Sequence, residues 1–297
     1  MNKKILVIGD VMMDIYWTGD VTRLSQEAPV PVVRYQHEER RAGAAANVAL
    51  NCQAMGTETA LLSAIGSDAI SYALEHMVKH SVFLHHTADT TRKLRIIGKQ
   101  QQITRVDFDC VTPDVFAAKL EQKFMHMMHG FDIIIFSDYG KGVLRYVEKM
   151  IQAARDADKI VLVDPKGHNY GKYRGASLIK PNIDEMREMV GGWDSEEELA
   201  EKTANFLENG GFGAVLLTRA SAGMTLFTKD KPPFHVPSEA RNVFDVTGAG
   251  DVSIAAFAVS LARGLNWNQA TTCASKAAGL SVERFGTVAI TEAEVFL

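Results

Sequence analysis

Two glycines separated by one residue stand directly before an apolar stretch near the carboxyl end of the chain. Gly248 and Gly250 flank Ala249, and Asp251 begins the apolar, helix-like run that follows. Because glycine has no Cβ, backbone N–H groups can converge at such a turn, and a helix dipole adds partial positive charge there. The segment therefore predicts an anion-binding turn. Asp251 could simply cap the helix, and the isolated motif gives capping and a functional role equal weight.

Other polar turns follow short apolar runs of strand type. The runs lie at 5–9, 60–66, 132–137, 159–164 and 214–218, and helical patterns lie near 44–55, 68–80, 113–128, 143–156, 196–208 and 251–263. Buried strands that alternate with helices predict an α/β fold with a parallel sheet. Ligands of such sheets bind outside the carboxyl ends of the strands, so we expect the polar turns to share one crevice.

Three segments depart from this alternation and predict a second, smaller sheet. Residues 29–36, 92–98 and 101–108 alternate apolar with polar side chains, which is typical of antiparallel strands with one exposed face. We interpret them as a lid over the crevice. The exposed edge of such a sheet could be covered by another copy of the chain, which predicts a homodimer.

Composition excludes several classes of protein. The 297 residues are 46% hydrophobic and 23% charged, which excludes a disordered chain and a small disulfide scaffold. A net charge of -4 provides no general attraction to nucleic acid or anionic membrane, and no apolar run is long enough to span a bilayer. The three cysteines lack the spacing of a disulfide framework or zinc site. We expect a cytoplasmic protein without nucleic-acid or membrane partners.

Two motifs about 200 residues apart resemble the signatures of the ribokinase-like (PfkB) sugar kinases. DVTGAGD at 245–251 is similar to the family's carboxyl-terminal signature, and GAAAN at 43–47 is similar to its Gly-Gly-x-x-Asn turn. The resemblance covers nearly the whole chain. It implies a ribokinase-like three-layer sandwich with a mostly parallel central sheet and a small β lid. It also implies one domain over 1–297, with lid strands from about 15–37 and 90–108.

The resemblance implies a role for each residue of the phosphoryl-transfer site. Asp251 would be the general base, and the amides of Gly248, Ala249 and Gly250 would hold the transferring phosphoryl group. Asn182 and Glu185 would order Mg²⁺ through water, although as a helix cap and its partner they have a simpler explanation that the residues alone favour. The remaining implied ATP-binding residues are Lys166, Thr218, Gly223, Asp245 and Thr247. A monovalent cation is a further cofactor that this family resemblance suggests.

The implied acceptor site uses residues from the amino-terminal half. Asp14, expected on the turn after the first strand, and Asn47 would bind sugar hydroxyls, with Gly43 beside them. A distal phosphate needs a cationic partner, for which the candidates are Lys93, Arg95 and Arg105 on the lid strands. Asp138 and Lys141 would face the transferred group. Each of these side chains could otherwise be an ordinary turn, cap or solvated residue.

Within the family, the stretches EAPVPVV, SDYGKG and VDPKG are similar to those of heptose 7-phosphate kinases. This implies ATP-dependent phosphorylation of the anomeric hydroxyl of D-glycero-β-D-manno-heptose 7-phosphate to the 1,7-bisphosphate, in lipopolysaccharide precursor synthesis, with only the kinase step present. A kinase of another sugar, sugar phosphate or nucleoside, and a non-catalytic sugar-binding sensor, are the alternatives. Ala44 departs from the signature's glycine, which predicts a tighter pocket or a negative φ there. Arg219 and Val252 also depart from the pattern, without removing a catalytic group.

Overall fold

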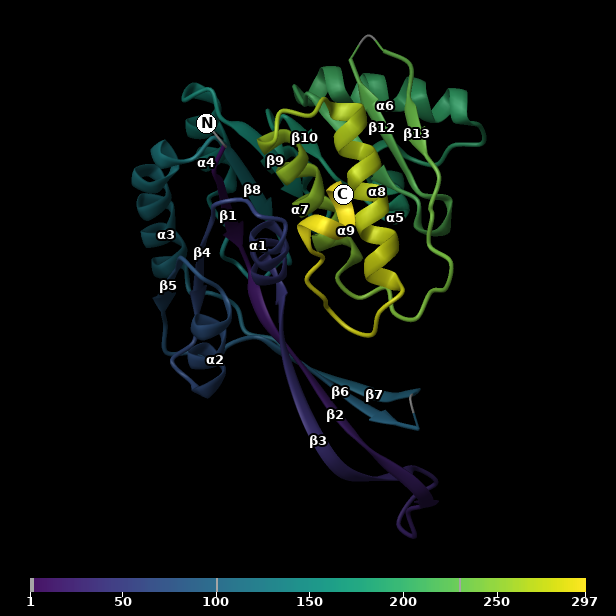
Figure 1. Cartoon of the computed structure of the whole chain (residues 1–297). Helices are drawn as coiled ribbons and strands as arrows, with labels where there is room; N and C mark the ends of the chain where they lie inside the picture. Colours follow the sequence, from purple (N-terminus) through teal and green to yellow (C-terminus); the bar gives the residue numbers. More distant parts are fainter. Residues whose placement is uncertain (1–2, 100, 230) are drawn as a thin grey trace.

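A large, mostly parallel sheet forms the centre of the fold (Figure 1). The computed structural model describes residues 3–99, 101–229 and 231–297. The strand order of this sheet is β13-β12-β11-β10-β9-β8-β1-β4-β5, parallel from β11 to β5, with β12 and β13 antiparallel at one edge. The strands are β1 (Ile5–Gly9), β4 (Thr59–Ile65), β5 (Ser81–His85), β8 (Ile133–Ser137), β9 (Ile160–Asp164), β10 (Leu178–Ile179), β11 (Ala214–Thr218), β12 (Met224–Thr228) and β13 (Phe234–Val236).

Helices cover both faces of this sheet and bury one apolar cluster on each. One face packs against α1 (Ala45–Ala54), α2 (Ala69–Met77), α7 (Ala249–Ala262), α8 (Trp267–Val282) and α9 (Glu292–Phe296). The other packs against α3 (Asp114–Met127), α4 (Val147–Asp156), α5 (Ile183–Val190) and α6 (Glu196–Gly210). This arrangement confirms the predicted three-layer α/β fold. Among the described helices, none combines the length and apolarity needed to cross a bilayer.

α7 is the most enclosed helix of the site region. Its residues from Asp251 to Ala262 are all buried, because α7 packs against β1, β8 and β9 and is also contacted by α1 and α8. Its sequence is apolar around the whole circumference, as expected for a helix inside a core. Enclosure fixes the position of its first turn, and therefore the position of the glycine motif.

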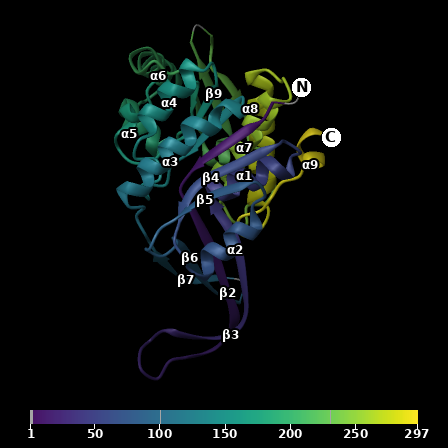
Figure 2. The ribbon, with the colours of Figure 1, turned by 90° about the vertical axis from the view of Figure 1, so that its left-hand side faces the viewer.

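A second sheet extends away from the body as a long ribbon (Figures 1 and 2). Its order is β3-β2-β6-β7, formed by β2 (Val11–Leu24), β3 (Pro31–Ala44), β6 (Arg92–Gly98) and β7 (Gln101–Phe108). We call this sheet the lid. The expected antiparallel pairing is confirmed for β6 with β7 and for β2 with β3, but it was wrong between β2 and β6, which pair in parallel. The expected turn at Asp14 was wrong too, since β2 begins at Val11 and places Asp14 inside a strand.

Candidate active site

A cavity opens at the carboxyl ends of β8, β9, β10 and β11, where parallel sheets usually bind ligands. Its volume is about 740 Å³. Residues from each strand end line it, together with the first residues of α7. Among the expected site residues, those that line it are Asp138, Lys166, Asn182, Glu185, Thr218, Gly223, Ala249 and Gly250. The expected shared crevice is confirmed for the turns after β8, β9 and β11, whereas Gly9 and Asp10 after β1 do not line this cavity.

The glycine turn has the backbone that an anion site requires. Gly248 adopts φ +81°, and a Cβ at this position would lie 2.8 Å from Nδ2 of Asn47, so only glycine fits without a shift. Gly248 is also the N-cap of α7, and no side chain caps the helix. The Ala249 N–H donates to the carbonyl oxygen of Val246 at 3.3 Å, so the amides that follow it in the first turn of α7 are the ones that can bind an anion beside the cavity.

Asp251 is held by hydrogen bonds at both carboxylate oxygens. The hydroxyl of Tyr139 donates to Oδ1 at 2.7 Å, and Nδ2 of Asn47 donates to Oδ2 at 3.0 Å. Burial raises the pKa of this carboxyl to about 7 and Asp164 adds to the rise, while both hydrogen bonds and Lys180 oppose it. A carboxyl with a pKa near neutrality is suited to take up a proton during a reaction.

Lys180 brings a buried cation to the same point. Its side chain is 5% exposed, forms an ion pair with Asp164 at 3.0 Å, and lies with Nζ 3.3 Å from where a Cβ of Gly250 would be. Burial raises the pKa of Asp164, and the neighbouring ammonium opposes this rise. Sequence reasoning missed Lys180, although it lies only two residues before Asn182. Together with the helix amides, it makes this corner of the cavity electropositive.

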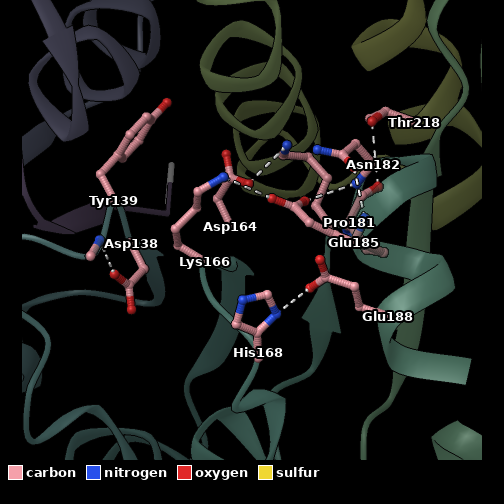
Figure 3. Close-up of polar contacts among 12 residues, drawn as sticks. Asp138, Tyr139, Asp164, Lys166, His168, Pro181, Asn182, Glu185, Glu188 and Thr218 are labelled. Atoms are coloured by element: carbon pink, nitrogen blue, oxygen red, sulfur yellow. Dashed lines mark hydrogen bonds and ion pairs between the residues drawn. The ribbon is translucent and has the colours of Figure 1, made fainter.

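Asn182 and Glu185 form a capping box at the start of α5 (Figure 3). Oδ1 of Asn182 accepts from the Glu185 N–H at 2.9 Å, and Oε2 of Glu185 accepts from the Asn182 N–H at 3.0 Å. The other carboxylate oxygen of Glu185 lies 3.5 Å from Nζ of Lys166. The helix-capping role, which the residues alone favoured for Asn182 and Glu185, is therefore present in the structure. Both side chains nevertheless line the cavity.

Some of the expected nucleotide-binding residues line the cavity, and others support the turns beside it. Gly223 has φ +90°, and a Cβ there would lie 2.1 Å from the carbonyl oxygen of Val236. Asp245 does not line the cavity; its carboxylate accepts from the N–H groups of Thr247 at 2.9 Å and Gly286 at 3.0 Å. Thr247 is likewise outside the lining. Arg219 forms a two-pronged ion pair with Glu196 of α6 at 2.6 and 2.7 Å, which explains this departure from the pattern as a surface contact.

The sugar-side candidates lie along the lid and α1. Asp14 and Arg95 form a buried ion pair at 2.5 Å, and a Cβ on Gly43 would lie 2.4 Å from Oδ2 of Asp14. The strand register places Lys93, Arg95 and Arg105 on one face of the lid. Arg105 is exposed and pairs with Asp107, whereas Arg95 is occupied by Asp14.

The side chains of Asp138 and Lys141 both bind other residues of the chain. The Asp138 carboxylate accepts from Nζ of Lys172 at 2.8 Å, from the hydroxyl of Tyr173 at 2.7 Å and from the Gly140 N–H at 2.7 Å. Nζ of Lys141 pairs with Asp109 at 2.7 Å, and its side chain lies outside the large cavity. In this structure both residues support the turn that carries Tyr139.

The expected negative φ at Ala44 was wrong. Ala44 adopts φ 56° and ψ -135°, a region that side-chain-bearing residues rarely populate. The residue ends β3 and precedes α1, so the chain must turn sharply there to bring Asn47 to Asp251. The site therefore contains a strained alanine where the family signature has glycine.

Solved structures of a phosphofructokinase and a ribokinase share this architecture. Phosphofructokinase-2 from Escherichia coli in complex with potassium superposes with a TM-score of 0.85 at 16% identity, covering 99% of this chain and 97% of that one. Arabidopsis thaliana ribokinase complexed with ribose and ATP gives 0.79 at 19%, covering 99% and 98%. At these identities the likeness shows the fold alone, and it confirms the expected ribokinase-like sandwich.

The chain belongs to the pfkB family of carbohydrate kinases, whose signature it matches over residues 2–294. It is 45% identical to the bifunctional protein HldE of Pasteurella multocida, over 98% of this chain and 62% of that protein. It is 44% identical to D-beta-D-heptose 7-phosphate kinase of Bordetella bronchiseptica, over 98% of this chain and 95% of that one. The chain thus spans about three fifths of its bifunctional relatives, 62% in the first case.

Proposed function

We propose that this chain is an ATP- and Mg²⁺-dependent kinase that phosphorylates the anomeric hydroxyl of D-glycero-β-D-manno-heptose 7-phosphate. The product is the 1,7-bisphosphate, a precursor of the lipopolysaccharide core. The observation that carries the proposal is the buried Asp251 carboxylate at the start of α7, beside amides that open to the large cavity. The 44% identity to a relative named as this kinase supports the choice of sugar.

In the proposed mechanism the Asp251 carboxylate and the neighbouring amides have different tasks. Asp251 takes the proton of the anomeric hydroxyl as the sugar oxygen attacks the γ-phosphorus of ATP. The amides of Gly248, Ala249 and Gly250 stabilise the charge on the transferring phosphoryl group, and Nζ of Lys180 adds a cation at the same corner. The oxygen between the β- and γ-phosphorus atoms leaves with its electron pair on ADP.

The cavity fits a nucleotide and a hard cation. Its volume of about 740 Å³ is of the size of small-molecule sites, and Lys166, Thr218 and Gly223 line it together with Ala249 and Gly250 of the glycine turn. The side-chain oxygens of Asn182 and Glu185 suit Mg²⁺ held through water. When bound, Mg²⁺ neutralises phosphate charge and orients the γ-phosphoryl group.

The proposed sugar-binding site is based on the strand register of the lid. We propose that Asp14 and Asn47 contact sugar hydroxyls, with Gly43 leaving room for the carboxylate. Lys93 and Arg105 share a lid face with Arg95, and this cationic face is the proposed partner of the distal phosphate. Asp138 and Lys141 would act by holding the turn beside the acceptor.

We also propose how the chain is organised, where it acts, how it assembles and which further ion it uses. The chain forms a single kinase domain over 1–297 whose lid is built by the segments near 15–37 and 90–108. It acts in the cytoplasm, assembles as a homodimer through the lid, and uses a monovalent cation. Activity in K⁺ against tetramethylammonium salts at equal ionic strength tests the last of these.

A substrate panel tests the choice of sugar. The chain is incubated with ATP, Mg²⁺ and heptose 7-phosphate, fructose 6-phosphate, tagatose 6-phosphate or ribose, and ADP release is measured. We expect turnover with the heptose phosphate, and a phosphate ester at the anomeric carbon by ³¹P and ¹³C NMR. Turnover confined to a hexose phosphate would refute the sugar assignment, and ATP binding without ADP release from any acceptor would favour a sensor.

A further inference from the structure

Tyr139 makes the shortest hydrogen bond to the proposed base, and the family motifs do not assign it a role. Its hydroxyl lies 2.7 Å from Oδ1 of Asp251. Tyr139 lines the large cavity, whereas Asp251 is outside the lining and only 1% exposed. The phenol therefore both contacts the carboxylate and forms part of the cavity wall.

The backbone around Tyr139 is fixed by a buried carboxylate from a different strand. Asp10, directly after β1, accepts from the N–H groups of Tyr139 at 2.9 Å, Lys141 at 3.0 Å and Val143 at 3.0 Å. Gly140 adopts φ +71° and donates its N–H to Asp138, the residue before Tyr139. These contacts hold the backbone of the turn on both sides of Tyr139. The direction in which the phenol leaves the backbone is therefore fixed by the turn, and only its side-chain torsions remain to be set.

We propose that Tyr139 is a positioning residue of the kinase reaction, which orients the Asp251 carboxylate and stabilises its ionised form through the phenol O–H donor. This rests on the proposed function of Asp251 as base. A hydrogen bond donated to a carboxylate favours the charged form, and the effect is larger in a buried site. The orienting effect arises because Tyr139 and Asn47 each bind a different oxygen of the same carboxylate.

The proton balance of this step leaves Tyr139 unchanged. The acceptor O–H bond breaks, its proton moves to Asp251, and the acceptor oxygen forms the new bond to phosphorus while the bond to ADP breaks. Burial and the nearby carboxylate of Asp251 raise the pKa of Tyr139 well above its usual value, so the phenol keeps its proton. Around the carboxylate, the other charged groups are Asp164, which raises the pKa of Asp251, and Lys180, which lowers it.

Tyr139→Phe removes the donor and keeps the ring. A hydrogen bond to a charged group contributes about 1.5–3 kcal/mol, so the acidic limb of the kcat/KM profile should move up by about one to two pH units. We expect kcat near pH 7 to fall about fivefold to fiftyfold and to recover at high pH, while KM for ATP stays unchanged. A purely structural role of Tyr139 would not move the limb.

Tyr146→Phe is the matched control. Tyr146 also donates its hydroxyl to a carboxylate, Oδ1 of Asp114 at 2.9 Å, but at an exposed contact. Its removal should leave both the pH profile and kcat within twofold of the unaltered protein. Replacement of Tyr139 with 3-fluorotyrosine, a stronger donor of nearly the same shape, should move the limb downward, and this keeps the test valid if the Phe variant folds poorly.

A second readout does not depend on turnover. The carboxyl ¹³C resonance of Asp251, assigned by its loss in Asp251→Asn, is titrated in both chains. A higher pKa in Tyr139→Phe together with a shifted rate profile supports the proposal, and an unchanged pKa overturns it. A raised pKa with an unshifted rate profile also overturns the positioning role, because the base of the reaction would then be another group. If no sugar phosphate is a substrate, the titration alone decides whether Tyr139 controls this carboxyl.

Discussion

At the scale of single residues, the chemistry we propose depends on Asp251 as a proton acceptor. Asp251→Asn keeps the shape of the side chain but replaces one of the two oxygens that accept from Tyr139 and Asn47 by an N–H donor, and it cannot take up the proton. We expect kcat to fall by about 10²-fold or more, with ATP affinity by calorimetry within a few-fold. Turnover close to that of the unaltered chain would exclude Asp251 as the base.

The same substitution should change how stability depends on pH. Burial raises the pKa of Asp251 from 3.8 to about 7 in the folded chain. Between these pH values the unfolded chain loses a proton that the folded chain keeps, so this group's contribution to stability falls as the pH rises. Asp251→Asn removes that cost, so the variant should be the more stable chain at pH 8, by at most about 4 kcal/mol, and lose this advantage toward pH 4.

Urea unfolding at several pH values measures this difference. Asp114→Asn is the control, because the Asp114 side chain is 59% exposed and its removal should not produce a pH-dependent gain. A stability difference for Asp251→Asn that stays constant from pH 4 to pH 8 would contradict the raised pKa. The result is independent of the substrate, since no ligand enters the measurement.

Residue types indicated part of the site, and the rest needed the fold. Asp251 and Asn47 lie in recognisable motifs, whereas Tyr139 meets Asp251 across 112 positions of the chain, a contact that no local pattern shows. Lys180 is comparable, since a lysine after a two-residue strand has no local sign that it will be buried beside a helix start. At Ala44 the residue type was itself misleading, because an alanine predicts a negative φ and the structure has a positive one.

At the scale of elements, the strands that sequence reasoning found are those with continuous apolar runs. β1, β8 and β11 are buried along nearly their whole length, and α7 is apolar throughout. β10 escaped notice because it has only two residues. The parallel pairing of β2 with β6 was missed because alternation identifies a strand but not the direction of its neighbour.

The lid and the glycine turn are joined by Arg41 of β3. Its guanidinium donates to the carbonyl oxygens of Phe285 and Thr287, and the Gly286 N–H between them donates to Asp245, which also accepts from Thr247. Arg41→Ala should therefore loosen the turn before α7. We expect faster amide hydrogen exchange at 245–250 and a lower kcat, with a loss of about 1–3 kcal/mol in stability.

Arg40→Ala is the control for this contact. Arg40 precedes Arg41, points to the opposite face of the strand, and pairs with Glu38 at 2.5 Å. Its loss should leave exchange at 245–250 and kcat unchanged. Equal effects of the two substitutions would show that charge on the lid, and not the contact to the 285–287 turn, is responsible.

At the scale of the whole molecule, the two faces of the lid differ in chemistry. The face with Lys93, Arg95 and Arg105 also carries Tyr16, which packs on Phe285 of the body with ring centroids 5.2 Å apart. Register places Trp17 and Val106 on the opposite face, where they are 39% and 40% exposed. Apolar side chains exposed on a sheet that extends from the body (Figure 2) are typical of a surface for association.

A lid-mediated dimer should therefore dissociate when this apolar face receives a charge. In light scattering after size-exclusion chromatography we expect the unaltered chain near twice 32.6 kDa and Val106→Lys near 32.6 kDa, because a buried lysine without a partner opposes association. Val115→Lys is the control: Val115 is 56% exposed on α3, in the body of the molecule, so the same change there should leave the dimer intact. A monomeric unaltered chain at micromolar concentration, or a Val106→Lys variant that remains dimeric, would refute assembly through this face.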